Sequence, residues 1–367
     1  FSKKPTKPVP EDKELHDLRT KRQMLKDEYE IEFEKERRRK RTMREKVYDG
    51  VMDVVNIPKS LLSSLDFSAP LRQGLVLSAG NPRAAGRATK EMFRQAFSQK
   101  NADEWLAALK QTDQYKLMKD SGLYLAEPTA MLTAREESFI SNFAEKIPLV
   151  GRLIKGSGRA YAGYLNKLRA DVFSYGANQM MDQGITPQSN PKAYEKWAGF
   201  INNATGRGEL HSTIESATPL LNAMFFSPRF IASRFNLLNP VKYATMPKAA
   251  RKLAMQNVVA FVGFYAVIAA ILGAAGAEEE EDPRSSDFGK FKFGNTRYDM
   301  LGGFAQPIRF LAQLITGQAK KNGVIKELDG KKFPFETRAD VALRFARTKL
   351  SPSAGIVADV LTGKDMV

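Results

Sequence analysis

The sequence predicts an all-α fold: an elongated assembly of helices with one hydrophobic helix long enough to span a membrane, and at most a small β-hairpin. Two observations carry this prediction. Apolar residues recur at intervals of three or four, as at Tyr161, Leu165, Leu168, Val172 and Tyr175, which places them on one face of a helix. The two-residue alternation typical of strands is missing from the first half of the chain.

Composition and charge restrict the classes of function. The 367 residues include 57 Lys and Arg against 41 Asp and Glu, and the net charge of +16 favours polyanionic partners: nucleic acid, anionic lipid headgroups or an acidic protein surface. Cysteine is absent, which excludes disulfides, thiolate chemistry and cysteine-ligated zinc. His16 and His211 are far apart in the sequence, so we expect no histidine-rich metal site. We also expect no cofactor.

Changes in composition divide the chain into seven segments. Prolines mark the first, opposite charges with few apolar residues the second, and Gly, Pro and Asn punctuate the third. The segments are a linker at 1–10, a charged long helix at 11–47, a helical domain at 48–182, a basic aromatic helical region at 183–252, a hydrophobic helix at 253–277, an acidic linker at 278–287, and a C-terminal hairpin with helices at 288–367. The start at Phe1, without methionine, indicates a piece of a longer polypeptide.

Two groups of cations are candidate contacts for DNA or lipid. The first is Arg37, Arg38, Arg39, Lys40 and Arg41, near the end of the charged helix. A solvated helix face explains that group equally well, because the C-terminal end of a helix favours positive charge. The second is Lys248, Arg251 and Lys252, just before the most apolar part of the chain.

That apolar part, residues 258–277, is twenty positions without a charge. At 1.5 Å per residue it is about 30 Å long, the thickness of a bilayer core. Cations precede it and five acids from Glu278 to Asp282 follow it, so the positive-inside rule places its N-terminal side in the cytoplasm. The residues expected to meet the membrane include Val258, Phe261, Phe264, Val267 and Ile271.

The same segment has a second interpretation. An alanine-rich helix that is hydrophobic all round is also typical of the centre of a soluble bundle. A third interpretation joins the two, with the helix shielded in one assembly and inserted in another. Gly263, Gly273 and Gly276 would let neighbouring helices approach closely.

The C-terminal segment contains the most strand-like stretch. Phe291 and Phe293 alternate with lysines, which predicts a small hairpin within 288–298 or an aromatic-basic anchor at a membrane interface. Residues 301–321 and 336–349 are expected to be helical.

Motifs for catalysis fail at identifiable positions. Gly156-Ser157-Gly158 lacks the spacing of a nucleotide-binding loop and follows no clear strand, so we interpret these glycines as helix ends. Glu137-Ser138 and Glu215-Ser216 are similar to the Glu-Ser pair of lytic transglycosylases, but neither is followed by the glycine-rich turn of that family. We therefore expect that the chain is not an enzyme.

Several passages over residues 115–367 together resemble a known family. They are Lys119-Asp120-Ser121-Gly122-Leu123, Ala134-Arg135-Glu136-Glu137, Ile147-Pro148-Leu149-Val150-Gly151-Arg152, Leu165-Asn166-Lys167-Leu168-Arg169-Ala170-Asp171, Ile201-Asn202-Asn203-Ala204-Thr205-Gly206-Arg207-Gly208, Phe225-Phe226-Ser227-Pro228-Arg229, Lys349-Leu350-Ser351-Pro352 and Asp359-Val360-Leu361-Thr362-Gly363. This array resembles the C-terminal part of the large polyvalent, or internal virion, proteins of tailed bacteriophages.

The resemblance implies a protein that is packaged in the virion and ejected with the genome or ahead of it. Its expected place is the virion interior and then the host envelope, in the periplasm or inner membrane. The implied role is an oligomeric, membrane-associated conduit for DNA translocation. The implied partners are other copies of the chain in a homo-oligomer, other virion proteins, phage DNA bound without sequence specificity, and the bacterial membrane. The alternative is a soluble scaffold between domains of a giant phage protein.

Overall fold

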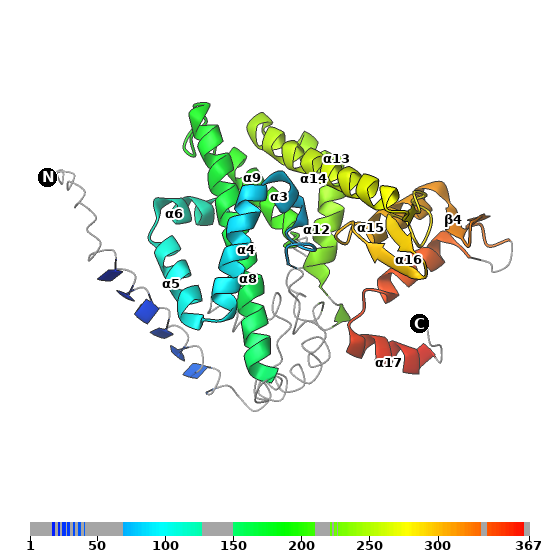
Figure 1. The fold of residues 1–367 in the computed structure, drawn as a ribbon, viewed down its shortest axis with the longest axis horizontal. Coiled ribbons are helices and arrows are strands. Elements are labelled where there is room, and N and C mark those ends of the chain that lie inside the picture. The colour runs from blue at the N-terminus through cyan, green and yellow to red at the C-terminus, as the bar shows by residue number, and fades with distance from the viewer. Residues whose placement is uncertain are drawn as a thin grey trace.

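The computed structural model describes residues 69–126, 150–209, 227–331 and 336–362, with isolated positions between 17 and 40 and at 221, 224 and 225. Its fold is mostly helical, with one long apolar helix and two small antiparallel sheets, which confirms the predicted fold class (Figure 1). The described positions from Asp17 to Arg37 are helical, and Lys40 lies in a turn.

The first helices form the body of the molecule. In chain order they are α3 (Leu75–Gly80), α4 (Pro82–Ala96), α5 (Gln99–Lys110), α6 (Asp113–Asp120), α8 (Val150–Asp182) and α9 (Pro191–Ala204). Side chains at their starts accept hydrogen bonds from free backbone N–H groups: Ser98 caps α5, Thr112 caps α6 and Asn190 caps α9. Pro82 and Pro191 occupy first helical positions, where a missing N–H costs nothing.

The main core lies between α4, α8 and α9. Tyr164 and Leu168 of α8 and Trp197 of α9 are fully buried there, together with the alanines of α4. Arg159 of α8 donates to the carbonyls of Gln95 at 3.0 Å and Ala96 at 2.8 Å, which satisfies the C-terminal end of α4. Helices α4 and α8 therefore pack along each other as one unit (Figure 1).

Three helices follow in the basic aromatic region: α12 (Pro228–Leu238), α13 (Pro240–Ala244) and α14 (Lys248–Ala274). Helix α14 is a continuous helix of 27 residues that begins directly after Pro247. It starts ten positions before the uncharged segment at 258, so the helix is longer than the apolar run that predicts it.

The C-terminal region contains both sheets. Strands β1 (Glu278–Glu279), β2 (Lys290–Phe293) and β3 (Thr296–Asp299) form one antiparallel sheet, and β4 (Gln318–Lys321) with β5 (Val324–Glu327) forms the other. Helices α15 (Ala305–Thr316), α16 (Arg338–Arg347) and α17 (Pro352–Thr362) complete the region. The hairpin expected within 288–298 is present, with Phe291 opposite Tyr298.

Two sequence expectations are corrected in this region. The sequence predicts a linker at 278–287, but Glu278 and Glu279 pair with β2 as a third strand. It also predicts a helix that continues to 321, but α15 ends at Thr316 because Gly317 turns into the left-handed conformation, and β4 follows. Asn322 and Gly323, both with positive φ, form the turn between β4 and β5.

Candidate membrane interface

Helix α14 is the one helix in the described part of the chain that is long and apolar enough to cross a membrane. Its 27 residues extend about 40 Å at 1.5 Å per residue. Proline is absent from within it, and valine, isoleucine and alanine dominate its second half. The question for function is which of its sides the rest of the protein covers.

One side of α14 packs on the helical core. Leu253, Ala254 and Asn257 are buried, and the helix lies against α3 and α9. Farther along, Phe261 packs on Phe304, with ring centroids 5.4 Å apart, and Tyr265 lies 5.9 Å from the ring of Phe291. These contacts fix α14 to the helical core and to the C-terminal region.

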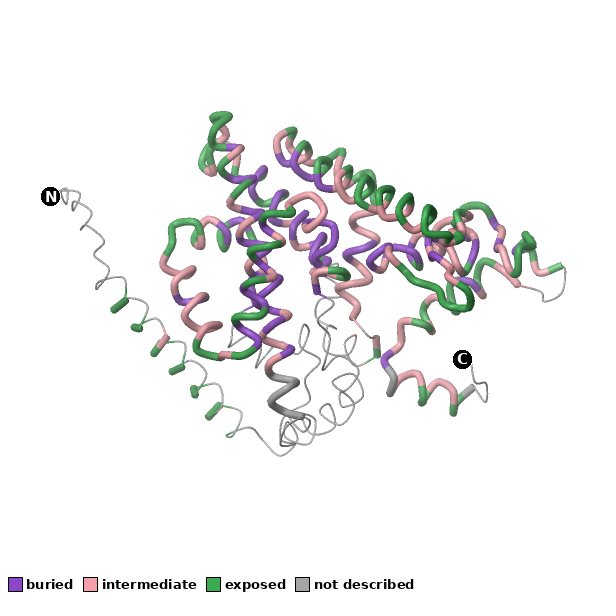
Figure 2. The backbone as a smooth tube through the Cα atoms, in the orientation of Figure 1, coloured by how far each residue is buried: buried purple, intermediate pink, exposed green. Residues whose placement is uncertain are grey.

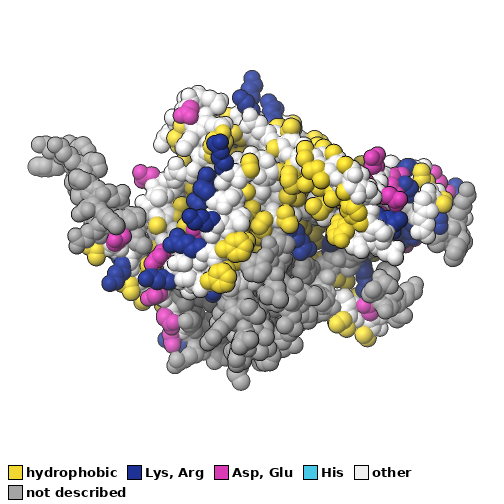
Figure 3. Space-filling model, viewed as in Figure 1, with side chains coloured by type: hydrophobic (Ala, Val, Ile, Leu, Met, Phe, Trp, Pro, Cys, Tyr) yellow, Lys and Arg dark blue, Asp and Glu magenta, His cyan; other side chains and the backbone are white. Residues whose placement is uncertain are grey.

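The opposite side of α14 is apolar and exposed. Met255, Val259, Val262, Val267 and Ile271 are between 41% and 65% exposed, and only 11% of the most apolar 18-residue window of the helix is buried. In Figure 2 exposed positions predominate in the second half of α14, at the edge of the molecule, and Figure 3 shows hydrophobic side chains gathered over it. The helix is thus neither enclosed like a bundle centre nor free on all sides.

The five residues predicted to meet a membrane divide between the two sides. Val258 and Phe261 are partly buried and pack against the core. Phe264, Val267 and Ile271 are 39%, 59% and 58% exposed and belong to the open side. The apolar run therefore contains residues that pack on the core and residues that stay exposed. Its composition does not tell the two groups apart.

The glycines of this segment do not make the close helix contacts that the sequence suggests. A Cβ atom built on Gly263, Gly273 or Gly276 would meet nothing within 4 Å in the described structure. Gly276 instead adopts a φ of +90° and helps the chain to reverse after the helix.

The cations predicted to contact DNA or lipid are placed as follows. Lys248 and Lys252 are exposed in the first turns of α14, and Arg251 is half-buried beside them. Of the earlier cluster, Arg37 and Lys40 are exposed. Arg38, Arg39 and Arg41 lie outside the described residues.

The acids that follow α14 are fixed by partners distant in sequence. Tyr265 donates to a carboxylate oxygen of Glu279, Lys292 pairs with Glu278 at 3.3 Å, and Lys320 pairs with Glu280 at 2.8 Å. The hydrogen bond from Lys320 lowers the pKa of Glu280 below its usual value. The acidic run therefore joins the end of α14 to the C-terminal sheets.

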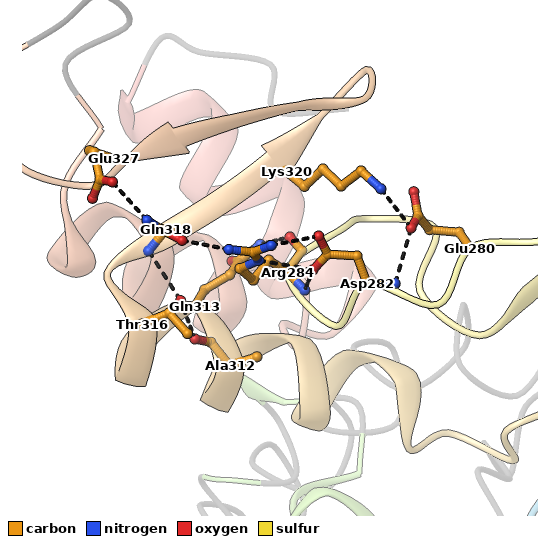
Figure 4. Close-up of polar contacts among 9 residues, drawn as sticks. All are labelled: Glu280, Asp282, Arg284, Ala312, Gln313, Thr316, Gln318, Lys320 and Glu327. Atoms are coloured by element: carbon orange, nitrogen blue, oxygen red, sulfur yellow. Dashed lines mark hydrogen bonds and ion pairs between the residues drawn. The ribbon is translucent and has the colours of Figure 1, made fainter.

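Arg284 is the centre of this network (Figure 4). Its guanidinium donates to both carboxylate oxygens of Asp282 at 2.9 Å and to Gln318 at 2.5 Å. The hydrogen bonds from Arg284 lower the pKa of Asp282 to about 2. Gln313 of α15 donates to the backbone carbonyl of Arg284 at 2.7 Å, so the loop and the helix hold each other in place.

A second group of cations emerges only from the structure. Arg83, Arg87, Lys90 and Arg94 are all exposed along one side of α4, and the opposite side of α4 packs on α8. The signal in the sequence is their spacing of four, three and four residues, which aligns them on one helix face. Sequence reasoning missed it because no basic residues are adjacent there.

The described residues contain no group of acids and histidines able to hold a metal ion. Gly156 and Gly158, interpreted from sequence as helix ends, lie inside α8 instead. Glu137 and Glu215 lie outside the described residues.

Comparison with protein-family models, with curated proteins and with solved structures finds no match for this chain. The resemblance to phage internal virion proteins therefore stays a prediction.

Proposed function

We propose that this chain is a non-catalytic structural module that attaches to a bacterial membrane through α14. The observation that carries the proposal is the exposed apolar side of α14, opposite a side that is packed. Contact with lipid would remove the half-exposed side chains of Val259, Val262 and Ile271 from water, which is worth on the order of 1 kcal/mol each. Monomeric proteins rarely leave a continuous apolar face of this kind uncovered.

The wider role is that of a segment of a phage internal virion protein. In this proposal the chain leaves the virion with the genome and joins other copies in a conduit at the host envelope, through which phage DNA passes. The sequence resemblance and the charge of +16 support this setting.

The contacts of α14 favour attachment in the plane of the membrane surface before any insertion across it. A helix that exposes one apolar side while its other side stays packed on the protein can enter the headgroup and acyl boundary without leaving the fold, as interfacial helices do with their apolar faces. Spanning the bilayer with residues 258–277 would require Phe261 to leave Phe304, Tyr265 to leave Phe291, and the Tyr265 to Glu279 hydrogen bond to break. We therefore propose that spanning in the conduit follows a separate undocking step.

The alternative is a soluble scaffold in which a second copy or another virion protein covers the apolar side. The secure packing of Leu253 and Asn257 favours it, because α14 is already part of a folded core. The two functions differ in what touches Val267: lipid in the first, protein in the second.

Vesicle flotation tests the membrane function with matched variants. Val267 on α14 and Val324 on β5 are both 59% exposed, so replacing either with arginine disturbs folding equally little. We expect the wild type and Val324→Arg to float with vesicles. Val267→Arg should bind at least tenfold more weakly, because arginine in hydrocarbon costs about 2.5–3.5 kcal/mol. Equal binding by both variants, or no binding by the wild type, would refute the proposal.

Self-association is measured separately, with Gly263→Leu. This change keeps the exposed side apolar but fills one of the two glycine positions of α14, Gly263 and Gly273, where the backbones of two helices could meet. If copies cover each other through this side, the concentration-dependent mass seen by analytical ultracentrifugation should fall in the variant. Unchanged association would place the contact between copies elsewhere.

A further inference from the structure

The basic row on α4 consists of Arg83, Arg87, Lys90 and Arg94. Its positive charge is only partly balanced by ion pairs. Arg87 pairs with Asp171 at 2.8 Å, and Arg94 lies 3.7 and 3.8 Å from carboxylate oxygens of Glu91 and Glu104. Arg83 and Lys90 have no ion pair among the described residues. The row extends about 16 Å along the helix at 1.5 Å per residue.

Aromatic side chains border this row. Phe93, on the adjoining edge of the same face of α4, is 51% exposed, and Phe97, directly after the helix, is 86% exposed. A row of cations beside exposed phenylalanines is the composition of helices that lie at a membrane surface. Duplex DNA would use the cations but offers nothing to the phenylalanines.

The row and the apolar side of α14 face the same way. Figure 3 shows a stripe of Lys and Arg over α4 and the hydrophobic patch over α14 on one face of the molecule. Helix α3 connects them, because it packs against α14 and leads into α4 through Asn81. The hydrogen bond between Asn81 and Asn257, at 2.7 Å, fixes the two parts of the face relative to each other.

We infer that the basic row of α4 and the exposed side of α14 form one docking surface for a bilayer rich in anionic phospholipid. The inference rests on the proposed function and adds the class of lipid and a second contact element. In this surface Val267 and its neighbours enter the acyl region, while Arg83 and Lys90 meet headgroup phosphates. Each basic residue near an anionic surface contributes roughly a fivefold gain in binding.

The test measures binding of the full chain to vesicles of pure phosphatidylcholine and of phosphatidylcholine with phosphatidylglycerol. The variant is Arg83→Gln with Lys90→Gln. The control is Lys192→Gln with Lys196→Gln, two exposed lysines of α9 outside this surface, so both proteins lose the same charge. Circular dichroism confirms that both fold.

We expect the wild type and the control to prefer the anionic vesicles, and the α4 variant to lose about 10- to 30-fold there, from two fivefold contributions. Its binding to neutral vesicles should not change. The loss should shrink in high salt, because screening weakens the headgroup contacts.

Four results would overturn the inference, and they differ in what they imply. If the wild type binds neutral and anionic vesicles equally well, or if the variant and the control lose the same affinity, the basic row is not a lipid contact. The proposed function would still stand in both cases. A variant that loses binding to duplex DNA but not to vesicles assigns the row to nucleic acid. A wild type that binds neither vesicle refutes the proposed function itself.

Discussion

Asn81 donates a hydrogen bond to Asn257 Oδ1 at 2.7 Å, across 176 residues of sequence. Asn257 is buried in α14, and its own amide donates to the carbonyl of Leu253 at 2.9 Å. Gly80 lies so close that a Cβ there would stand 2.5 Å from the same oxygen. This contact fixes the first half of α14 against α3, and so it determines which side of the helix stays open.

Replacing Asn257 with alanine should weaken that attachment. We expect the free energy of unfolding to fall by about 1–2 kcal/mol, because a buried hydrogen bond is lost. Denaturant titration measures the change. Gln256→Ala is the control, since Gln256 is the exposed neighbour on the same helix and its loss should change stability by less than about 0.5 kcal/mol. Equal effects of the two changes would mean that the hydrogen bond does not hold α14.

Helices α8 and α9 approach each other through a glycine. A Cβ on Gly176 would lie 2.5 Å from Nε1 of Trp197, which is 1% exposed and donates to the carbonyl of Phe173 at 3.3 Å. Gly176→Ala should therefore lower stability by about 1–3 kcal/mol through overpacking. Gly86→Ala, in a helix position with nothing within 4 Å, should raise it by up to about 1 kcal/mol. Thermal unfolding of both variants checks the opposite signs.

Arg234 is buried without a carboxylate partner among the described residues. Its guanidinium stacks on Phe230 at 4.4 Å and Phe304 at 4.6 Å, and only Nη2 has an acceptor, the carbonyl of Arg72 at 2.7 Å. We expect Arg234→Met to stay within about 1 kcal/mol of the wild type, because it fills the space without a buried charge.

The comparison is Arg234→Ala, which should lose about 2–4 kcal/mol through the cavity it leaves. Chemical denaturation of the two variants side by side separates packing from charge. A methionine variant as unstable as the alanine variant would show that the cation–π and hydrogen-bond contacts, rather than volume, stabilise this site.

The Asp282–Arg284 pair should make the stability of the protein depend on pH in the acidic range. Because the pKa of Asp282 is lowered from 3.8 to about 2 in the folded state, its contribution is complete above about pH 5 and is lost as the pH falls towards 2. The stability difference between the wild type and Asp282→Asn should therefore shrink over that window. Unfolding curves at pH 6, 4 and 3 measure it. A difference that stays constant would mean that the carboxylate is not what Arg284 recognises.

Local patterns in the sequence located much of the fold. The uncharged run at 258–277 predicts α14, because an apolar run of this length is too long for one strand and fits a helix. Alternating Phe and Lys predicted the β2–β3 hairpin, which Phe291 anchors in the core. Asn322-Gly323, a standard hairpin turn, is a local signal for the second sheet, and the helix predicted over 301–321 does not take it into account.

Only part of the candidate interface can be predicted from the sequence. The sequence named Phe264, Val267 and Ile271 together with Val258 and Phe261, since all five are equally apolar. The basic row on α4 was present as a spacing, but a spacing does not tell which side of a helix a neighbour covers. The contacts of α4 with α8 made that row an outer surface.

The helical class, the excess of positive charge and the position of one long apolar helix follow from the amino-acid sequence, because periodicity, charge and propensity are local properties. That α14 is covered on one side and open on the other depends on how the helices pack. So does the pairing of the acids after α14 with Lys292, Lys320 and Arg284, in place of a linker. Both outcomes depend on residues brought together from distant parts of the chain, and no local pattern records such a contact.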